Sequence, residues 1–421
     1  MTNHISPLAC LPFGALLAAI ALLPLLVPRL WEKNQNKAVI AALLTIPVFI
    51  FLINGLQREL WHALEEYLSF MIMIGSLFVI SGGILIRGDL RATPLVNTGF
   101  LLAGSLLANL IGTTGASVLL IRPLLRTNSE RVRTKHIPVF FIFLVANIGG
   151  ALTPLGDPPL FLGYLRGVPF TWNLRLFPMW LTALAFLLTI FYIWDRRCYR
   201  REKPSDIRRD RAESSPLRIS GIINVFNLLI IVAAVFFQVP SPFREIIMLG
   251  ATVLSWTVTE RRIRAANDFT WHPVVEVAIL FAAIFITMKP VMLLLAAHGA
   301  ALGITRPWQY FWLVGGLSSF LDNAPTYVTF FGLAASVTQS LGSGGMPVVA
   351  GVRGDLLAAI SCGAVFMGAN TYIGNGPNFM VKAIAEKAGF QVPHFFEYMI
   401  YSALILLPLF ILITFLFFGK A

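Results

Sequence analysis

The 421-residue chain is 57% hydrophobic and 12% charged, and its mean hydropathy is +0.78. Because soluble domains carry about 25% charged residues, this composition excludes a soluble globular protein and predicts an all-α polytopic membrane protein. The net charge of +12 follows from basic loops on the cytoplasmic side and requires no nucleic acid partner. The three cysteines are an odd number and lie far apart without histidine partners, which excludes a disulfide framework and a cysteine metal site.

Long apolar segments predict about ten membrane crossings and two re-entrant hairpins. The first segment, from about Leu8 to Val27, lacks the preceding basic residues of a signal peptide, so we expect a retained helix with its N-terminus outside. Four segments are interrupted by glycine, proline or polar residues. In chain order the predicted spans are 8–28, 38–55, 66–86, 95–121 (interrupted), 137–163 (interrupted), 176–194, 219–237, 245–259, 271–297, 308–340 (interrupted), 355–385 (interrupted) and 395–418.

The positions of arginine and lysine set the expected topology. If 95–121 and 308–340 are hairpins that enter and leave on one side, the basic loop 196–218 faces the cytoplasm and both termini face outside. We expect the plasma membrane, such as the inner membrane of a bacterium. Few basic residues are then expected on the outer side of the membrane: Arg58, Arg166, Arg175, Arg244, Arg306, Arg353 and Lys420.

One short stretch occurs twice, as Gly150-Ala-Leu-Thr-Pro-Leu-Gly-Asp-Pro-Pro159 and Gly368-Ala-Asn-Thr-Tyr-Ile-Gly-Asn-Gly-Pro377. Its prolines prevent a continuous α-helix, and a broken helix at membrane depth requires a protein interior or a wet cavity. Paired broken helices in two halves of a chain indicate the binding site of a secondary transporter.

The hairpin tips also align, with Leu110–Gly115 opposite Leu321–Thr326, so that Ile111 is the counterpart of Asp322. An odd number of crossings between the two units predicts an inverted repeat. We therefore divide the chain into an N-terminal extra transmembrane helix, a first inverted repeat, a basic linker with a connecting helix, and a second inverted repeat. Their bounds are 1–37, 38–195, 196–244 and 245–421.

Two carboxylates, Asp157 in the first break and Asp322 in the second hairpin tip, are expected within the membrane. A charge at depth is costly and indicates function, here the binding of Na⁺. The alternative is a structural cap on the helix that follows each break. Lys289 is the one basic residue expected at depth, and we predict that it forms an ion pair with Asp157 or Asp322.

Neutral oxygen-bearing side chains accompany these charges and suit a hard cation. For each of them an interhelical hydrogen bond is the alternative to ligation. The second site gathers Asn323, Thr326, Asn370, Thr371, Asn375 and Asn378; the first gathers Thr113, Thr114, Ser117, Asn147 and Thr153. The helix N-termini at the same breaks suit an anion, so the pattern leaves the sign of the substrate open.

The repeat, the tip Leu-Asp-Asn-Ala-Pro-Thr (321–326) and the breaks Gly-Asp-Pro-Pro (156–159) and Gly-Asn-Gly-Pro-Asn (374–378) resemble the ion transporter superfamily. That group includes sodium/proton antiporters, arsenite permeases and citrate or dicarboxylate symporters. The resemblance covers about 38–418 and implies a homodimer with a scaffold at the interface and a moving transport domain. The Asp-Asn-x-Pro-Thr tip is most similar to the antiporter and arsenical branches, and Gly-Asp-Pro-Pro-Leu to a citrate transport branch.

These observations favour a Na⁺/H⁺ antiporter that works by alternating access. The alternative is a Na⁺- or H⁺-coupled symporter of citrate or another carboxylate. Two aspartates with one lysine favour a cation over a di- or trianion. We expect no cofactor besides the transported ions. An enzyme is disfavoured because no metal-ligand spacing or nucleophile arrangement appears.

Overall fold

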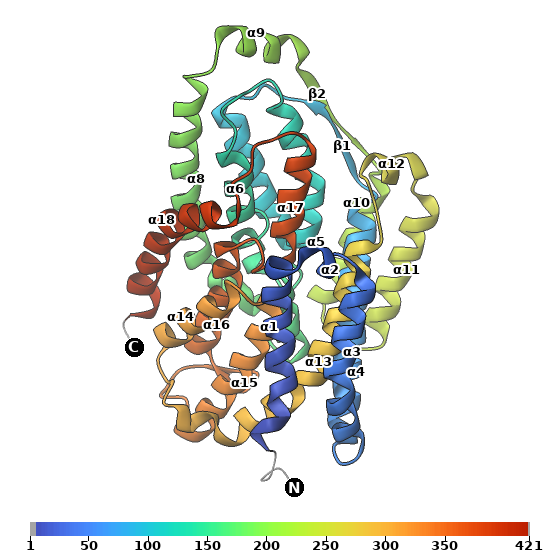
Figure 1. Ribbon diagram of the computed structural model, residues 1–421, viewed down its shortest axis with the longest axis vertical. Coiled ribbons are helices and arrows are strands. Elements are labelled where there is room, and N and C mark those ends of the chain that lie inside the picture. The colour runs from blue at the N-terminus through green and yellow to red at the C-terminus, as the bar shows by residue number, and fades with distance from the viewer. Residues whose placement is uncertain (1–5, 420–421) are drawn as a thin grey trace.

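The computed structural model describes residues 6–419, and its described part is predominantly helical, with two small two-stranded sheets (Figure 1). Seven of its helices are long and apolar enough to cross a membrane, and three shorter apolar helices accompany them. These features confirm an all-α polytopic membrane protein. Met1 and Lys420, which the charge pattern assigned to the outside, lie beyond the described residues.

The elements of the first half follow the predicted spans closely. They are η1 (Pro7–Cys10), α1 (Leu11–Leu26), α2 (Pro28–Trp31), α3 (Asn34–Ile53), α4 (Gln57–Ser81), β1 (Leu85–Asp89), α5 (Pro94–Thr127), α6 (His136–Leu144), η2 (Ile148–Leu152), α7 (Pro158–Leu165), η3 (Phe170–Leu176), α8 (Phe177–Tyr199), α9 (Pro204–Glu213) and β2 (Ser215–Ser220).

The second half repeats this order of elements from α11 onward. It contains α10 (Ile223–Phe236), α11 (Phe243–Val258), α12 (Arg261–Ala266), α13 (His272–His298), η4 (Gly299–Leu302), α14 (Pro307–Ser318), α15 (Asn323–Leu341), β3 (Val348–Val349), β4 (Val352–Arg353), α16 (Gly354–Met367), η5 (Gly368–Asn370), α17 (Gly376–Lys387), α18 (Phe395–Ile413) and the π-helical turn η6 (Thr414–Phe418).

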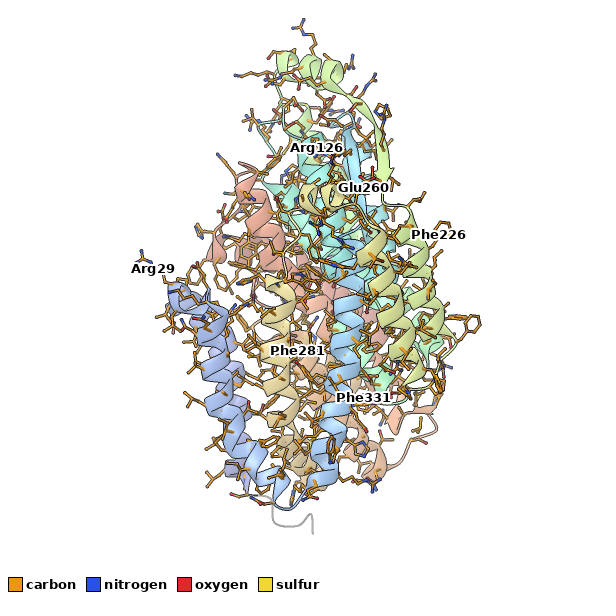
Figure 2. The ribbon with its side chains drawn as sticks, turned by 90° about the vertical axis from the view of Figure 1, so that its right-hand side faces the viewer. Arg29, Arg126, Phe226, Glu260, Phe281 and Phe331 are labelled. Carbon is orange, nitrogen blue, oxygen red and sulfur yellow. The ribbon has the colours of Figure 1, made fainter. Side chains whose placement is uncertain are left out.

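Helices α3, α4, α11 and α13 pack side by side in one group. Within it, Phe281 of α13, labelled in Figure 2, stacks on Phe70 of α4 with ring centroids 4.6 Å apart. On the outer flank, Phe226 of α10 projects from the ribbon and is 59% exposed. Exposed apolar side chains on such spans are expected where a protein meets lipid rather than water.

Helix α5 is a hairpin. Gly112 has φ 78° and ψ 154°, which no residue in an α-helix adopts, and the helix breaks there. Asn97, near the start of the element, and Asn128, just after its end, exchange side-chain hydrogen bonds of 2.9 and 2.8 Å. In a straight helix these residues would lie about 46 Å apart, so the two arms must run antiparallel. The predicted first re-entrant hairpin is confirmed.

The second hairpin consists of α14 and α15, which meet at the turn 319–322. Tyr310 on the first arm packs edge-on against Phe330 on the second, with ring centroids 6.3 Å apart. The two broken helices also form as predicted. The first is α6, η2 and α7, and the second is α16, η5 and α17.

The linker after α8 is more ordered than a solvated loop. It contains the short helix α9 and the strand β2, which pairs antiparallel with β1. Ile86 lies opposite Ile219 in this register. Figure 1 shows α9 and both strands at one end of the molecule. The sequence did not predict this sheet, because the five residues of β1 mix charged and apolar types without a strand pattern.

The packing of the two hairpins and two broken helices is reciprocal. Helix α7 packs against the second arm of the other hairpin, α15, and α17 packs against α5. Such an exchange of contacts between equivalent elements is what a two-fold relation requires. The division of the chain at 38, 196 and 245 stays a prediction.

The topology can be tested at Ser205, which is exposed on α9. In a variant whose native cysteines are replaced by serine, Ser205→Cys should resist a membrane-impermeant maleimide applied to intact cells and react after permeabilisation. Asn54→Cys, exposed at the end of α3, is the matched control and should react in intact cells, because its loop is predicted outside. Labelling of Ser205→Cys in intact cells would overturn the predicted orientation.

Candidate functional site

The two helix breaks have the same backbone course. Thr153 and Thr371, which end the 3-10 turns, have φ/ψ of −140°/157° and −138°/167°. Asp157 and Asn375, which precede the second helices, have −141°/143° and −150°/139°. The sequence repeat is therefore also a structural repeat, and Asp157 and Asn375 occupy equivalent positions.

Each break closes into a loop that only glycine permits at its crossing point. A Cβ on Gly156 would lie 2.0 Å from the carbonyl oxygen of Gly150, and one on Gly374 would lie 2.6 Å from that of Gly368. Carbon atoms do not approach backbone oxygens so closely, so a side chain at either position would force the loop open. This contact explains why the two glycines are six residues apart in both copies, at Gly150 and Gly156 and at Gly368 and Gly374.

Each loop is tied to the tip of the neighbouring hairpin by its threonine. Thr153 donates to the carbonyl of Asn109 at 2.5 Å, and Thr371 donates to that of Ser319 at 2.5 Å. These contacts show that the sequence alignment of the two hairpin tips, which paired Ile111 with Asp322, was wrong by one residue. The counterpart of Asp322 is Gly112, whose positive φ makes the turn without a side chain, and Ile111 is the counterpart of Leu321.

Asp157 lies at the centre of the site and has no exposed surface. Although it precedes α7, its side chain does not cap that helix, whose first two residues are prolines without N–H groups. The carboxylate instead accepts from three side chains of other elements. Thr113 donates to Oδ1 at 2.9 Å, Asn375 to Oδ1 at 3.2 Å, and Asn323 to Oδ2 at 2.5 Å.

Thr113 and Asn323 occupy equivalent places after the two hairpin turns, and Asn375 is the counterpart of Asp157 itself. Both repeats thus converge on a single carboxylate. Among residues 6–419, no lysine, arginine or histidine nitrogen lies within 4.0 Å of it. Asp157 is therefore a buried carboxylate held by neutral donors, and capping is excluded as its structural role.

Asp322 differs from Asp157 in both contacts and burial. It is only partly buried, and its carboxylate accepts from the backbone N–H of Ala324 at 3.1 Å, which makes it the N-cap of α15. A helix N-cap is the structural alternative that the sequence left open for this residue. The geometry supports that alternative for Asp322 and rejects it for Asp157.

A chain of amides fixes the position of Asn375. Besides the carboxylate of Asp157, the carbonyl of Ala146 and Oδ1 of Asn147 lie 3.1 and 3.2 Å from its Nδ2, so its two N–H groups are shared among three acceptors. Asn147 in turn donates to Asn378 at 2.7 Å, and Asn378 donates to the carbonyls of Gly368 and Thr371. Asn378 and Asn147 are thus brought to the site, where they hold the two broken helices together.

Three other predicted residues lie around the site without touching Asp157. Thr326 donates to the carbonyl of Asp322 at 3.0 Å, and Asn370 donates to the hydroxyl of Ser319 at 2.8 Å. Thr114 follows Thr113 in the second arm of α5 and is partly buried. The buried oxygens Asn323 Oδ1 and Asn370 Oδ1 accept no hydrogen bond from any described residue.

Lys289 does not pair with either aspartate, so the predicted ion pair is wrong. It lies in α13 and is 3.6 Å from Glu66 of α4, which also accepts from Arg166 at 2.9 Å. Glu66 is thus partly buried and contacts two basic side chains. The sequence could not reveal this pair, because it depends on how α4 and α13 pack.

The backbone carbonyl of Gly156 is not free at the break, because it accepts from the N–H of Thr113 at 2.8 Å. The sequence analysis also missed Asn109 and Ser319, whose carbonyls anchor the two loops. Asn109 further accepts from the N–H of Leu152 at 2.8 Å. Aligning the hairpins on their turn residues, Gly112 and Asp322, would have placed Asn109 and Ser319 at equivalent positions.

Comparison with known proteins identifies one family. The family described as "Putative citrate transport" matches residues 2–418, which is nearly the whole chain and includes every residue of the site described above. No curated protein matches the chain.

The crossing glycines provide a test of the site's architecture. Gly156→Ala and Gly374→Ala should each destabilise the purified protein by about 1–3 kcal/mol or more, because overpacked atoms must displace backbone. Gly376→Ala is the matched control, since a Cβ at Gly376 meets nothing within 4 Å. Thermal unfolding in detergent measures the effect. Equal stability of all three variants would mean that the loops do not close as described.

Proposed function

Because the chain belongs to the Putative citrate transport family, we propose that it is an ion-coupled secondary transporter whose coupling cation binds at Asp157. The observation that carries this proposal is a completely buried carboxylate with three neutral donors. Burying a carboxylate without a countercharge costs several kcal/mol. A bound proton or Na⁺ removes that cost, so the site has a physical reason to take up a cation.

The partners of Asp157 suit both a proton and a metal ion. The hydroxyl of Thr113 can donate to an ionised carboxylate and can accept from a protonated one. The unpartnered Oδ1 of Asn323 is a further oxygen on a residue that already contacts the carboxylate. Hard cations such as Na⁺ prefer carboxylate, amide and hydroxyl oxygens. Competition of H⁺ and Na⁺ for Asp157 would couple their movement in opposite directions.

We therefore favour cation/proton antiport, most simply of Na⁺ and H⁺. The hairpins and broken helices, which together form the site, would carry Asp157 between the two sides of the membrane. This is the alternating-access motion that the resemblance to ion transporters implies. The neutral donors and the lack of a basic contact at Asp157 support a cation over a free carboxylate as the bound species.

The family description favours a second candidate, the symport of citrate or another carboxylate with H⁺ or Na⁺. Helices α7, α15 and α17 all begin at the site, and helix N-termini attract anions. In this case a cation at Asp157 would neutralise the carboxylate before the substrate binds. Asp157 has the same coupling role in both candidates, which differ in whether a carboxylate accompanies the cation.

Proteoliposomes distinguish these candidates. Vesicles with an imposed inside-acid gradient should lose that gradient when Na⁺ or Li⁺ is added outside, and they should not accumulate labelled citrate. Citrate accumulation driven by a Na⁺ or H⁺ gradient would instead establish the symporter. Absence of both activities, with arsenite and phosphate also tested, would contradict the proposed transporter of cations or carboxylates.

Two variants test the assignment of the coupling site in the same vesicles. Asp157→Asn should reduce gradient-driven transport to the level of protein-free vesicles at every pH, because an amide neither ionises nor binds a proton. Asp322→Asn is the matched control and should retain most of the wild-type rate, since asparagine caps a helix as well as aspartate does. If Asp322→Asn abolished transport and Asp157→Asn retained it, Asp322 would be the coupling residue.

A further inference from the structure

A cavity lined by arginine side chains lies at the end of α8. This helix lies at the edge of the bundle beside α18 (Figure 1). The cavity has a volume of about 470 Å³ and extends along one face of the helix end. Its lining residues recur at intervals of three and four, so they lie on a single stripe. They are Ile190, Ile193, Trp194, Arg197, Cys198 and Arg201, together with Arg133 from the loop between α5 and α6.

The three arginines that line this cavity are exposed and lack acidic partners. Among the described residues, no carboxylate oxygen lies within 4.0 Å of Arg133, Arg197 or Arg201. The nearby acidic side chains point elsewhere. Asp195 is completely buried, where it accepts from Arg131 at 2.6 Å and contacts His136 at 2.9 Å.

Glu202 does not line the cavity but helps to form it. Its carboxylate is buried and accepts from the backbone N–H groups of Val132 and Arg133 at 3.3 and 2.8 Å. These bonds hold the α5–α6 loop against the end of α8, which brings Arg133 beside the arginines of the helix. The cluster of positive charge is thus built by the fold and is not a chance gathering of surface side chains.

The other half of the cavity is apolar. Ile193 is 46% exposed and lies within the apolar part of the span. Trp194 is partly buried and stacks on His136, with ring planes 4° apart. Tryptophan is enriched at the membrane–water interface. The apolar half therefore lies at the membrane edge, and the arginines lie just beyond it.

We propose that this cavity binds an anionic phospholipid. The phosphate would lie among Arg133, Arg197 and Arg201, since guanidinium groups pair with phosphate oxygens through two hydrogen bonds. An acyl chain would cover Ile190, Ile193 and Trp194. A free phosphate ion could satisfy the arginines only, and it would leave this apolar half uncovered. Basic pockets beside transmembrane helices are a known form of lipid headgroup site.

The test uses the purified full-length protein in a neutral detergent with phosphatidylglycerol as the probe. Native mass spectrometry should detect one tightly retained phosphatidylglycerol, and the lipid should raise the thermal unfolding temperature. Phosphatidylcholine, which has no net charge, and soluble glycerol 3-phosphate should do neither. The combined variant Arg133→Gln/Arg197→Gln/Arg201→Gln should bind phosphatidylglycerol roughly 100-fold more weakly, because each basic residue near a membrane surface contributes about fivefold in affinity.

The control variant Arg196→Gln/Arg200→Gln/Arg208→Gln removes the same charge from exposed arginines that do not line the cavity. It should keep the wild-type affinity. If the combined cavity variant does not fold, Arg197→Gln alone should still lose about fivefold. Three results would overturn the proposal: equal losses in both triple variants, equal binding of glycerol 3-phosphate, or conversion of a dimer to monomers by the cavity variant alone, which would identify a subunit interface.

Discussion

A single carboxylate organises the interior of this protein. Asp157 is completely buried and is held by Thr113, Asn323 and Asn375, which come from both hairpins and from the other broken helix. Three neutral donors stabilise the charge only in part, since desolvation of an ion costs several kcal/mol. We propose that a cation shares the site and removes this cost. The proposed coupling of transport to an ion gradient rests on the absence of a basic partner for the Asp157 carboxylate among the described residues.

The surrounding structure keeps that carboxylate buried. Glycine crossings close the two loops, and threonine side chains tie each loop to a hairpin tip. Because backbone groups freed by a helix break must find partners at membrane depth, these contacts are necessary for any such break. Both repeats provide the same framework, but only the first places an acid at its centre. The second places Asn375 there, which donates where Asp157 accepts.

The sequence predicted the spans, both hairpins and both breaks, because each depends on local properties: apolar length, proline and glycine. It did not predict which aspartate would be central. The residues around Asp157 and Asp322 are similarly polar, and only packing shows that one carboxylate faces other elements and the other caps its own helix. The predicted ion pair of Lys289 was wrong for the same reason, because its actual partner, Glu66, lies far away in sequence. The one-residue shift between the hairpin tips also required the contacts of Asn109 and Ser319.

The most direct test of the account measures protons released by the purified protein when Na⁺ is added in weakly buffered detergent solution. If Asp157 binds either cation, wild-type protein should release protons on addition of Na⁺ or Li⁺, and Asp157→Asn should release none. Choline chloride controls for ionic strength. Equal proton release by the wild type and by Asp157→Asn would show that the ions exchange at another group and would contradict the central role of this carboxylate.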